Sequence, residues 1–329
     1  MHILIVHHSK IPVMKYGGTE RVVWYLGKAL VKMGHKVTYL VMPGSACDFA
    51  NVLFLQNNTH ISTQIPNDVD VVHFHFTPEQ LHDIKKPYVI TIHGNNNDHT
   101  FFDTNTIFVS QNHAMRYGST CYVHNGIDWS SYPPPTFSTS KKYFHFLGDA
   151  GWRVKNLKGA IKIIHITKYE KLAVMGGDRF NFKQGIRLTL SPRISFWGMV
   201  GGDIKYRILQ HSKGMIFPVL WHEPFGLAII ESLYFGCPVF GTPYGSLSEI
   251  VTKEVGFLSN KSHELASAIL HYTQYSSKYC HDYALFHFNA DNMAQKYIEK
   301  YELVLKNKKL NDTPPQLVKI QNSKFLDWE

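Results

Sequence analysis

Residues 222–242 read HEPFGLAIIESLYFGCPVFGT and place two carboxylates, Glu223 and Glu231, eight positions apart. Pro224 suits the first position of a helix, because its missing N–H would have no intrahelical partner there. A helix that begins at Pro224 leaves free amides at its positive end, where they can hold an anion. These amides belong to Phe225, Gly226 and Leu227. Glu231 follows about two turns later, ~10 Å along the axis, so the spacing predicts a site for a sugar attached to a phosphate.

The residues after Glu231 predict the rest of this helix, a stop at Gly236 and then a buried apolar strand. The whole block 223–242 resembles the E-x7-E segment of the retaining glycosyltransferases with the GT-B fold, glycosyltransferase family 4 (glycosyl transferases group 1). The usual form of that segment is E-G-F-G-L-x-x-x-E-A-x-x-x-G-x-P-V. The alternative is that Glu223 and Glu231 are ordinary solvated carboxylates of a helix.

The resemblance implies an α/β protein of two Rossmann-like, doubly wound domains that face each other across a cleft. It implies a metal-independent, hexosyltransferase-like enzyme without a cofactor. Such an enzyme moves a sugar from a nucleotide diphosphate sugar, a UDP-sugar or GDP-sugar, to a hydroxyl of a carbohydrate or lipid-linked glycan acceptor, in cell-surface polysaccharide or glycolipid synthesis. Two alternatives stay open: a nucleotide-sugar epimerase of the same fold, and a non-catalytic basic module that binds carbohydrate or a surface.

Length and composition agree with such an enzyme. The 329 residues suit two domains of about 150, and no apolar run approaches the ~20 residues of a membrane span. The chain starts directly in a strand, which predicts a cytoplasmic protein. Its four cysteines lack metal-site spacing. The net charge of +9 is spread along the chain, which argues against nucleic acid and leaves open peripheral contact with an anionic membrane at its inner face.

The first half alternates apolar strands with helical stretches, which predicts a parallel sheet covered on both faces. A helix is predicted over Thr19–Met33. The predicted strands are Ile3–Val6, Val37–Val41, Val69–Val72, Tyr88–Ile92, Ile107–Val109 and Cys121–Val123. Ligands of such sheets bind at the carboxyl ends of the strands.

That rule directs attention to the loop of residues 8–18, which follows the first strand. Tyr16-Gly17-Gly18-Thr19-Glu20 opens the first helix, and two glycines let the backbone approach a phosphate closely. In the resembled family the matching G-G-x-E loop lies against the donor diphosphate and the acceptor. The alternative is that both glycines serve a tight turn only. A dinucleotide-redox fingerprint is not supported, because G-x-G-x-x-G is absent.

Histidines follow two further strands. His93, in Thr91-Ile92-His93-Gly94, can donate a hydrogen bond to a sugar hydroxyl or a departing phosphate oxygen, and the resemblance implies a donor-site role for it; a structural role is the alternative. His73 and His75 alternate on one face of a strand and could chelate a metal. No third ligand stands at a telling distance, so this reading is disfavoured.

The sequence predicts the end of the first domain near Asn125-Gly126-Ile127-Asp128, a turn that also occurs in the resembled family. Tyr132-Pro133-Pro134-Pro135 then predicts an extended linker. The predicted parts are an N-terminal acceptor-side domain, 1–137, and a C-terminal donor-side domain, 138–289. Residues 290–329 are predicted to form a closing helix, with a stripe at Met293, Tyr297 and Tyr301, and a loosely packed polar tail.

The second domain is predicted to start with the strand Tyr143–Leu147. The family usually has Arg directly after the following glycine and a Lys some five residues later, and the two hold the donor diphosphate. Here Asp149 stands at the Arg position, Lys155 matches the Lys, and the Arg role passes to Arg153 or is missing. The alternative is that Arg153 and Lys155 merely flank a helix start.

The remaining roles also come from the resemblance. The family's V-x-F-x-G-x-V segment beside the base matches Ile194–Val200, so Trp197, Gly198 and Met199 are the predicted base-binding residues; a packed core strand is the alternative. Glu223 is expected to bind the transferred sugar and Glu231 the ribose hydroxyls. Lys155 and the amides of residues 225–227 are expected to neutralise the leaving diphosphate.

Overall fold

A computed structural model describes residues 1–13, 17–181 and 187–329 of the chain, which divides into two compact units. Unit 1 comprises Met1–Val13, Gly17–Ser131 and Phe288–Gln321; unit 2 comprises 132–287 and Asn322–Glu329. The chain leaves unit 1 after Ser131, so the prolines that follow Tyr132 belong to unit 2, whereas the sequence had assigned them to the first domain. The reason is Tyr132, whose ring packs on Tyr206 and Tyr234 of unit 2.

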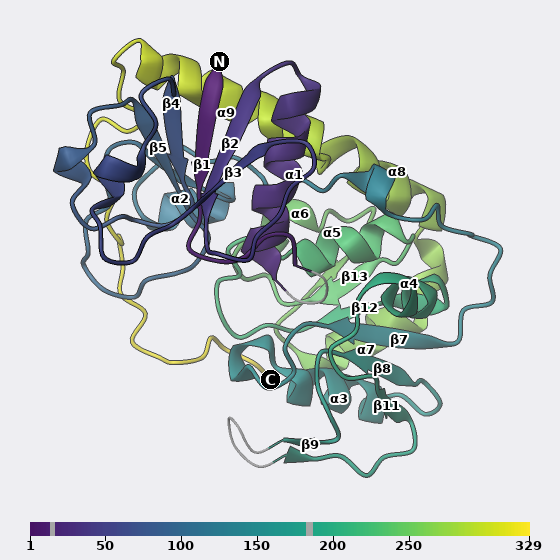
Figure 1. Cartoon of the computed structure of the whole chain (residues 1–329). Coiled ribbons are helices and arrows are strands. Elements are labelled where there is room, and N and C mark those ends of the chain that lie inside the picture. Colours follow the sequence, from purple (N-terminus) through teal and green to yellow (C-terminus); the bar gives the residue numbers. More distant parts are fainter. Residues whose placement is uncertain (14–16, 182–186) are drawn as a thin grey trace. The chain divides into compact units, whose positions relative to one another are not determined.

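The sheet of unit 1 has six strands in the order β3-β2-β1-β4-β5-β6, and all their pairings are parallel (Figure 1). Its strands are β1 (His2–Val6), β2 (Lys36–Val41), β3 (Asn51–Phe54), β4 (Val71–Phe74), β5 (Tyr88–Ile92) and β6 (Thr106–Phe108). The central strand β1 is buried throughout, as expected for a parallel sheet covered on both faces. The predicted strand at Cys121–Val123 was wrong, because only an isolated bridge from Tyr122 to Phe108 forms there.

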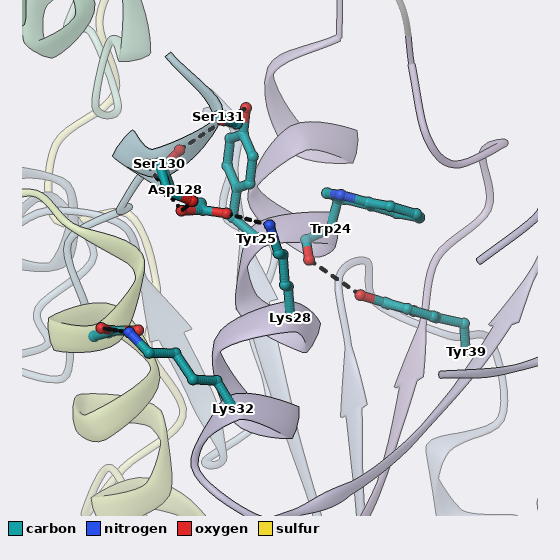
Figure 2. A network of polar contacts seen from close by, with 9 residues as sticks. Trp24, Tyr25, Lys28, Lys32, Tyr39, Asp128, Ser130 and Ser131 are labelled. Carbon is teal, nitrogen blue, oxygen red and sulfur yellow. Dashed lines mark hydrogen bonds and ion pairs between the residues drawn. The ribbon is translucent and has the colours of Figure 1, made fainter. Parts of the chain in front are cut away.

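The helices of unit 1 complete this layer. They are α1 (Gly18–Lys32), α2 (Gln111–Arg116) and α9 (Ala290–Leu305), with 3-10 turns at Ile61–Gln64, Leu81–Asp83 and Trp129–Ser131. The predicted stripe on α9 is buried and includes Met293, Tyr297 and Tyr301. Figure 2 shows two polar contacts beside α1: Lys28 Nζ lies 2.6 Å from Asp128, and the Tyr39 hydroxyl donates to the Trp24 carbonyl. Exposed ion pairs of this kind stabilise a fold little. The helices α1 and α9 are held mainly by the burial of their apolar side chains.

The segment after α9, predicted as a loosely packed tail, is anchored at a few buried residues, while most of its other residues are exposed. Asn311 is buried and bonds to Ser119 and to the carbonyls of Thr104 and Thr106. Leu317 joins a core cluster that includes Phe108. Residues 322–329 belong to unit 2, where the Leu326 amide donates to the Leu220 carbonyl. Polar composition misled the prediction, because these side chains satisfy buried backbone groups.

The sheet of unit 2 repeats the topology of unit 1, with six parallel strands in the order β11-β8-β7-β12-β13-β14. Its strands are β7 (Tyr143–Leu147), β8 (Leu172–Met175), β11 (Ile194–Phe196), β12 (Ser212–Phe217), β13 (Val239–Gly241) and β14 (Gly256–Leu258). A separate hairpin consists of β9 (Phe180–Asn181) and β10 (Arg187–Leu188).

The helices of unit 2 are α3 (Leu157–Ile166), α4 (Gly202–Gln210), α5 (Leu227–Tyr234), α6 (Leu247–Ile250), α7 (Ser262–Leu270) and α8 (Ser277–His287), with 3-10 turns η4 (Arg153–Lys155) and Tyr272–Gln274. Among the helices of the described residues, none is both long and apolar enough to cross a bilayer.

Both sheets share one strand order, which reads 3-2-1-4-5-6 when the main-sheet strands of each unit are numbered in turn. This is the doubly wound Rossmann order. The direction of winding reverses between β1 and β4 in unit 1 and between β7 and β12 in unit 2. Ligands of such sheets bind at the carboxyl ends of the strands that flank the reversal. The topology therefore points to the loops after these four strands.

One buried histidine gives unit 2 a pH-dependent stability. His145, on β7, lies between the hydroxyls of Ser212 and Ser232, and burial lowers its pKa from 6.5 to about 3. The unfolded chain therefore binds a proton that the folded chain does not bind between those two values. The free energy of unfolding should fall by roughly 2 kcal/mol between about pH 7 and about pH 5 because of this residue.

Urea unfolding of wild type and His145→Gln at several pH values measures that contribution. The variant should lose the His145 contribution to the acid dependence of the free energy of unfolding. His263→Gln, at an exposed position of α7, should keep the wild-type dependence. Equal slopes for wild type and His145→Gln would mean that His145 is not buried in its neutral form.

Candidate functional site

A buried ion pair lies at the winding reversal of unit 2. Lys155 follows β7 and Glu223 follows β12; Lys155 Nζ lies 2.6 Å from Glu223 Oε2, and both residues are less than a tenth exposed. Trp221 Nε1 donates to the same carboxylate oxygen at 2.8 Å. Removing two charges from water is costly, and their mutual attraction only partly offsets that cost. Lys155 and Glu223 were both predicted as site residues, and the structure places them in direct contact.

The local fold explains how Lys155 reaches Glu223. Asn156 adopts a left-handed conformation with φ 55°, and its side chain caps α3 at the amide of Gly159. The same side chain donates to the Pro218 carbonyl and so ties the loop after β7 to the loop after β12. The Glu223 backbone forms a bridge with Gly245, and its carbonyl accepts from the Ser246 amide. The contacts of Asn156 thus fix the loop that carries Lys155, and the contacts with Gly245 and Ser246 fix the backbone of Glu223.

The second carboxylate lies in a separate buried cluster. Glu231 Oε1 accepts from Lys205 Nζ at 2.5 Å and from the Tyr132 hydroxyl at 2.5 Å. Glu231 is 3% exposed and Lys205 6% exposed, so the alternative of solvated helix carboxylates was wrong for Glu223 and for Glu231. Lys205 and Tyr132 were not predicted from the sequence. The sequence around Lys205 in α4 contains no recognisable motif. Its role is visible only in the structure, where this lysine is buried beside Glu231.

The start of α5 differs from the prediction. The helix begins at Leu227, and Gly226 before it has φ 85°. This left-handed residue separates Pro224 from the helix, so the amides of the first turn belong to residues 227–229 rather than 225–227. The Ile229 amide already donates to the Gly226 carbonyl at 2.9 Å. The positive φ of Gly226 favours glycine, which adopts this conformation without the strain of a Cβ.

The loop after β7 also shows how Asp149 replaces the expected arginine. Asp149 Oδ1 accepts from the Gly151 amide at 2.8 Å, which shapes the loop locally. Arg153 is exposed, and its guanidinium lies 5.0 Å from the ring centre of Phe325 in the C-terminal segment. Lys155 Nζ lies 4.9 Å from the centre of the Trp221 ring. Of the two predicted cations, Lys155 contacts Glu223, whereas Arg153 packs on an aromatic ring.

The predicted base-binding residues follow β11. Trp197 and Met199 are 47% and 42% exposed, so the alternative of a packed core strand was wrong. Gly198 has φ 66°, and its carbonyl accepts from the Gly176 amide at 2.7 Å. This bond joins the loop after β11 to the loop after β8. The loops of β11, β8, β7 and β12 therefore follow one another along one edge of the sheet.

In unit 1 the predicted residues lie at the ends of β1 and β5. Gly17 has φ 154°, and a Cβ there would meet Glu20 and Val13 at 2.8 Å, so only glycine fits. Gly18 is the first residue of α1. Residues 14–16, including Tyr16 of the predicted loop, lie outside the described part of the chain. His93 is half-buried at the end of β5, and its Nε2 lies 2.9 Å from Nδ1 of His75.

The histidines near His93 form a cluster that the sequence analysis did not foresee. His73 is held by the Tyr301 hydroxyl and the Thr91 hydroxyl, both at 2.8 Å. Burial lowers the pKa of His93 to about 3 and that of His73 and His75 well below 6.5. Within the described ranges, no group of three or more His, Cys, Asp or Glu side chains is arranged to hold a metal ion. The sequence shows that His73 and His75 lie on one face of a strand. It does not show that they contact Thr91 and His93 at the end of β5.

Comparisons with known proteins agree with this geometry. Residues 141–274 match the glycosyl transferases group 1 family. Over 108 residues the chain is 35% identical to sucrose synthase of Denitrovibrio acetiphilus, a match that covers 32% of this chain and 13% of that enzyme. The fold is similar to AviGT4, a glycosyltransferase involved in avilamycin A biosynthesis, with a TM-score of 0.73 and 19% identity over 93% of this chain and 98% of that one.

A further similar structure is Anabaena HepE in complex with UDP-glucose, with a TM-score of 0.66 and 17% identity over 92% of this chain and 99% of that one. The chain therefore has the GT-B fold. The similarity to the glycosyl transferases group 1 covers residues 141–274. The predicted fold class of two doubly wound parallel sheets and the family resemblance of residues 223–242 are confirmed.

Proposed function

We propose that the chain transfers a sugar from a nucleotide diphosphate sugar to a hydroxyl of a carbohydrate or lipid-linked glycan, with retention of the anomeric configuration. The observation that carries this proposal is the buried Lys155–Glu223 pair at the winding reversal of unit 2. It stands inside the segment that matches the glycosyl transferases group 1. Its cation suits a diphosphate and its carboxylate suits a sugar hydroxyl.

The order of loops along the sheet edge supports an assignment for each part of the donor. Trp197, Gly198 and Met199 follow β11 and would hold the base, with the exposed Trp197 ring as a stacking surface. Lys155 follows β7 and would hold the diphosphate. Glu223 follows β12 and would accept from a hydroxyl of the transferred sugar. The sequence of strands thus matches the sequence base, phosphate, sugar in the ligand.

In this proposal Lys155 supplies the main electrostatic stabilisation of the reaction. Its ammonium has three donors and already lies in a site with little water. As the bond between sugar and phosphate breaks, negative charge grows on the diphosphate, and a fixed cation stabilises it without reorganisation. Glu231, held by Lys205 and Tyr132, would accept from the ribose hydroxyls. In unit 1, Gly17, Gly18 and His93 are the residues that we propose for contact with the nucleotide sugar.

Lys155 and the first-turn amides of α5 can balance a diphosphate, so we propose that no metal and no further cofactor are required. We also propose a cytoplasmic enzyme of polysaccharide or glycolipid synthesis, with peripheral contact to an anionic membrane. Its acceptor would be a surface glycan or its lipid-linked precursor.

To test this proposal, the protein is incubated with UDP-, GDP- and ADP-sugars in the presence of EDTA. The release of the nucleotide and the identity of the sugar products are then measured. HepE was solved with UDP-glucose, so UDP-glucose is the first donor to try. Slow release of a nucleotide diphosphate and free sugar without acceptor is expected. An isomerised sugar would indicate the epimerase instead. Neither release nor isomerisation with any donor would argue against a transferase.

Arg153 provides a separate prediction. Because its guanidinium lies on Phe325 and not at the ion pair, Arg153→Ala should lower turnover less than tenfold, whereas loss of a preorganised phosphate ligand lowers it about a hundredfold or more. Rates of nucleotide release from wild type, Arg153→Ala and Arg153→Lys decide the question. A loss of about a hundredfold in Arg153→Ala would mean that Arg153 swings onto the diphosphate and fills the role of the arginine that Asp149 replaces.

A further inference from the structure

The contact between His75 and His93 constrains which nitrogen of His93 carries a proton. His75 Nδ1 and His93 Nε2 lie 2.9 Å apart, within hydrogen-bond distance, and the rings stack at an interplanar angle of 21°. Both rings are neutral, because burial lowers the pKa of each far below 6.5. In a neutral imidazole one nitrogen donates and the other accepts. One of the two facing nitrogens must therefore carry a hydrogen and the other a lone pair.

The other nitrogen of His75 decides between the two arrangements. His75 Nε2 is buried without a hydrogen-bond partner among the described residues. If it carried the hydrogen, a buried N–H would be left without an acceptor, which is rarer in proteins than an under-satisfied acceptor. The favoured arrangement has the hydrogen on His75 Nδ1, which donates to His93 Nε2. Neutral His93 then carries its own hydrogen on Nδ1.

We propose that His75 is a positioning residue that fixes His93 as the Nδ1–H tautomer, so that His93 donates a hydrogen bond to an oxygen of the transferred sugar. The role of His93 toward the sugar rests on the proposed function; its tautomer does not. In the other tautomer, with the hydrogen on Nε2, the Nδ1 of His93 would instead accept a hydrogen bond from a sugar hydroxyl. The two tautomers would therefore orient the sugar differently.

The surroundings hold His75 in this arrangement. The His73 ring stacks on it with centroids 4.1 Å apart, and His73 is itself fixed by the hydroxyls of Tyr301 and Thr91. Thr91 in turn contacts the Tyr297 hydroxyl of α9 at 3.0 Å. This chain of contacts joins two buried tyrosines of α9 to His73 on β4 and to Thr91 on β5.

The titratable groups around the pair also favour its neutral form. His7 at the end of β1, His73 on β4 and His113 on α2 each disfavour a further positive charge on the pair. Glu20 on α1 acts in the opposite direction on His93 but is outweighed by burial. The tautomer of His93 should therefore stay the same across the neutral pH range.

Nuclear magnetic resonance of the ligand-free protein, labelled with 15N-histidine, tests the tautomer directly. Long-range 1H–15N spectra distinguish a protonated ring nitrogen from a bare one, and His93→Gln assigns the signal. The free imidazole side chain prefers the Nε2–H form, so a dominant Nδ1–H form of His93 supports the proposal. A dominant Nε2–H form in wild type would overturn it, whether or not any variant folds.

Two variants at position 75 test whether His75 is the cause. His75→Asn keeps an N–H donor near the place of Nδ1 and should retain the Nδ1–H form of His93. His75→Leu removes the donor at similar volume and should shift His93 toward Nε2–H. An unchanged His93 tautomer in a folded His75→Leu protein would show that another contact sets it.

Binding measurements then separate this proposal from the proposed function. His75→Leu should weaken UDP-glucose binding by about tenfold, in line with one lost hydrogen bond to the ligand, and leave UDP binding unchanged, while His75→Asn stays near wild type. An equal loss for UDP and UDP-glucose would contradict the link to the sugar. No binding of either ligand to wild type would count against the proposed function and leave the tautomer result intact.

Discussion

Replacing Lys155 with Met is expected to lower kcat by about 100- to 1,000-fold, the usual effect of removing one preorganised group at a developing anion. Methionine keeps much of the side-chain volume but removes the charge that lies 2.6 Å from Glu223. The measurement is nucleotide release under saturating donor. Lys158→Met, on the exposed side of α3, is the matched control and should keep wild-type turnover.

The same variant should also lose stability, because it leaves the Glu223 carboxylate buried without its cation, a change that typically costs 3–5 kcal/mol. The double variant Lys155→Met with Glu223→Gln separates the two effects. It should recover most of the stability, since no unpaired charge remains, yet stay inactive. Recovery of turnover together with stability would mean that the pair serves the fold and not the reaction.

The second large effect is expected at the cluster of Glu231, Lys205 and Tyr132. Glu231→Gln should weaken donor binding by roughly 1.5–3 kcal/mol, the value of a charge-assisted hydrogen bond. Lys205→Met should weaken it as well, because the carboxylate loses the partner that holds it at 2.5 Å. Titration with a nucleotide diphosphate and with its sugar should show similar losses, since the ribose is common to both.

A double-variant cycle shows whether Lys205 acts through Glu231. If it does, Lys205→Met with Glu231→Gln should bind no more weakly than the worse single variant. Arg207→Met, on the exposed face of α4, serves as the control for general effects on that helix. Donor affinity that is unchanged in folded Glu231→Gln protein would rule out the ribose role.

Much of the fold could be predicted from local patterns. The apolar runs of both halves gave the central strands within a residue or two, because a parallel strand buried on both faces needs continuous apolar residues. Tyr88–Ile92 and Tyr143–Leu147 agree with the observed strands. The short edge strand Asn51–Phe54 was missed, because its side chains are largely exposed and carry no such run.

The errors occurred where tertiary contacts override local preference. Pro224 suits a helix start, but Gly226 takes a left-handed conformation, and α5 begins after it. The polar residues after α9 suggest a solvated tail, yet the Asn311 side chain donates to the carbonyls of Thr104 and Thr106 in unit 1. Neither feature has a signal in the neighbouring sequence.

The candidate site shows the same division. Glu223, Glu231 and Lys155 were predicted because they lie in spaced motifs. Their partners Trp221, Lys205 and Tyr132 were missed, since each reaches its carboxylate only through the packing of separate elements. The sequence also left the role of Arg153 open, and its contact with Phe325 depends on a segment more than a hundred residues away along the chain.

The most direct test of the proposed donor site is isothermal titration of UDP, GDP and ADP into wild type and into the Lys155→Met, Glu223→Gln double variant. At least one nucleotide diphosphate should bind wild type, and it should bind the folded double variant more than tenfold more weakly, because the phosphate has lost its cation. Equal affinity for both proteins, or no binding of any of the three to wild type, would show that the Lys155–Glu223 pair is not a nucleotide diphosphate site.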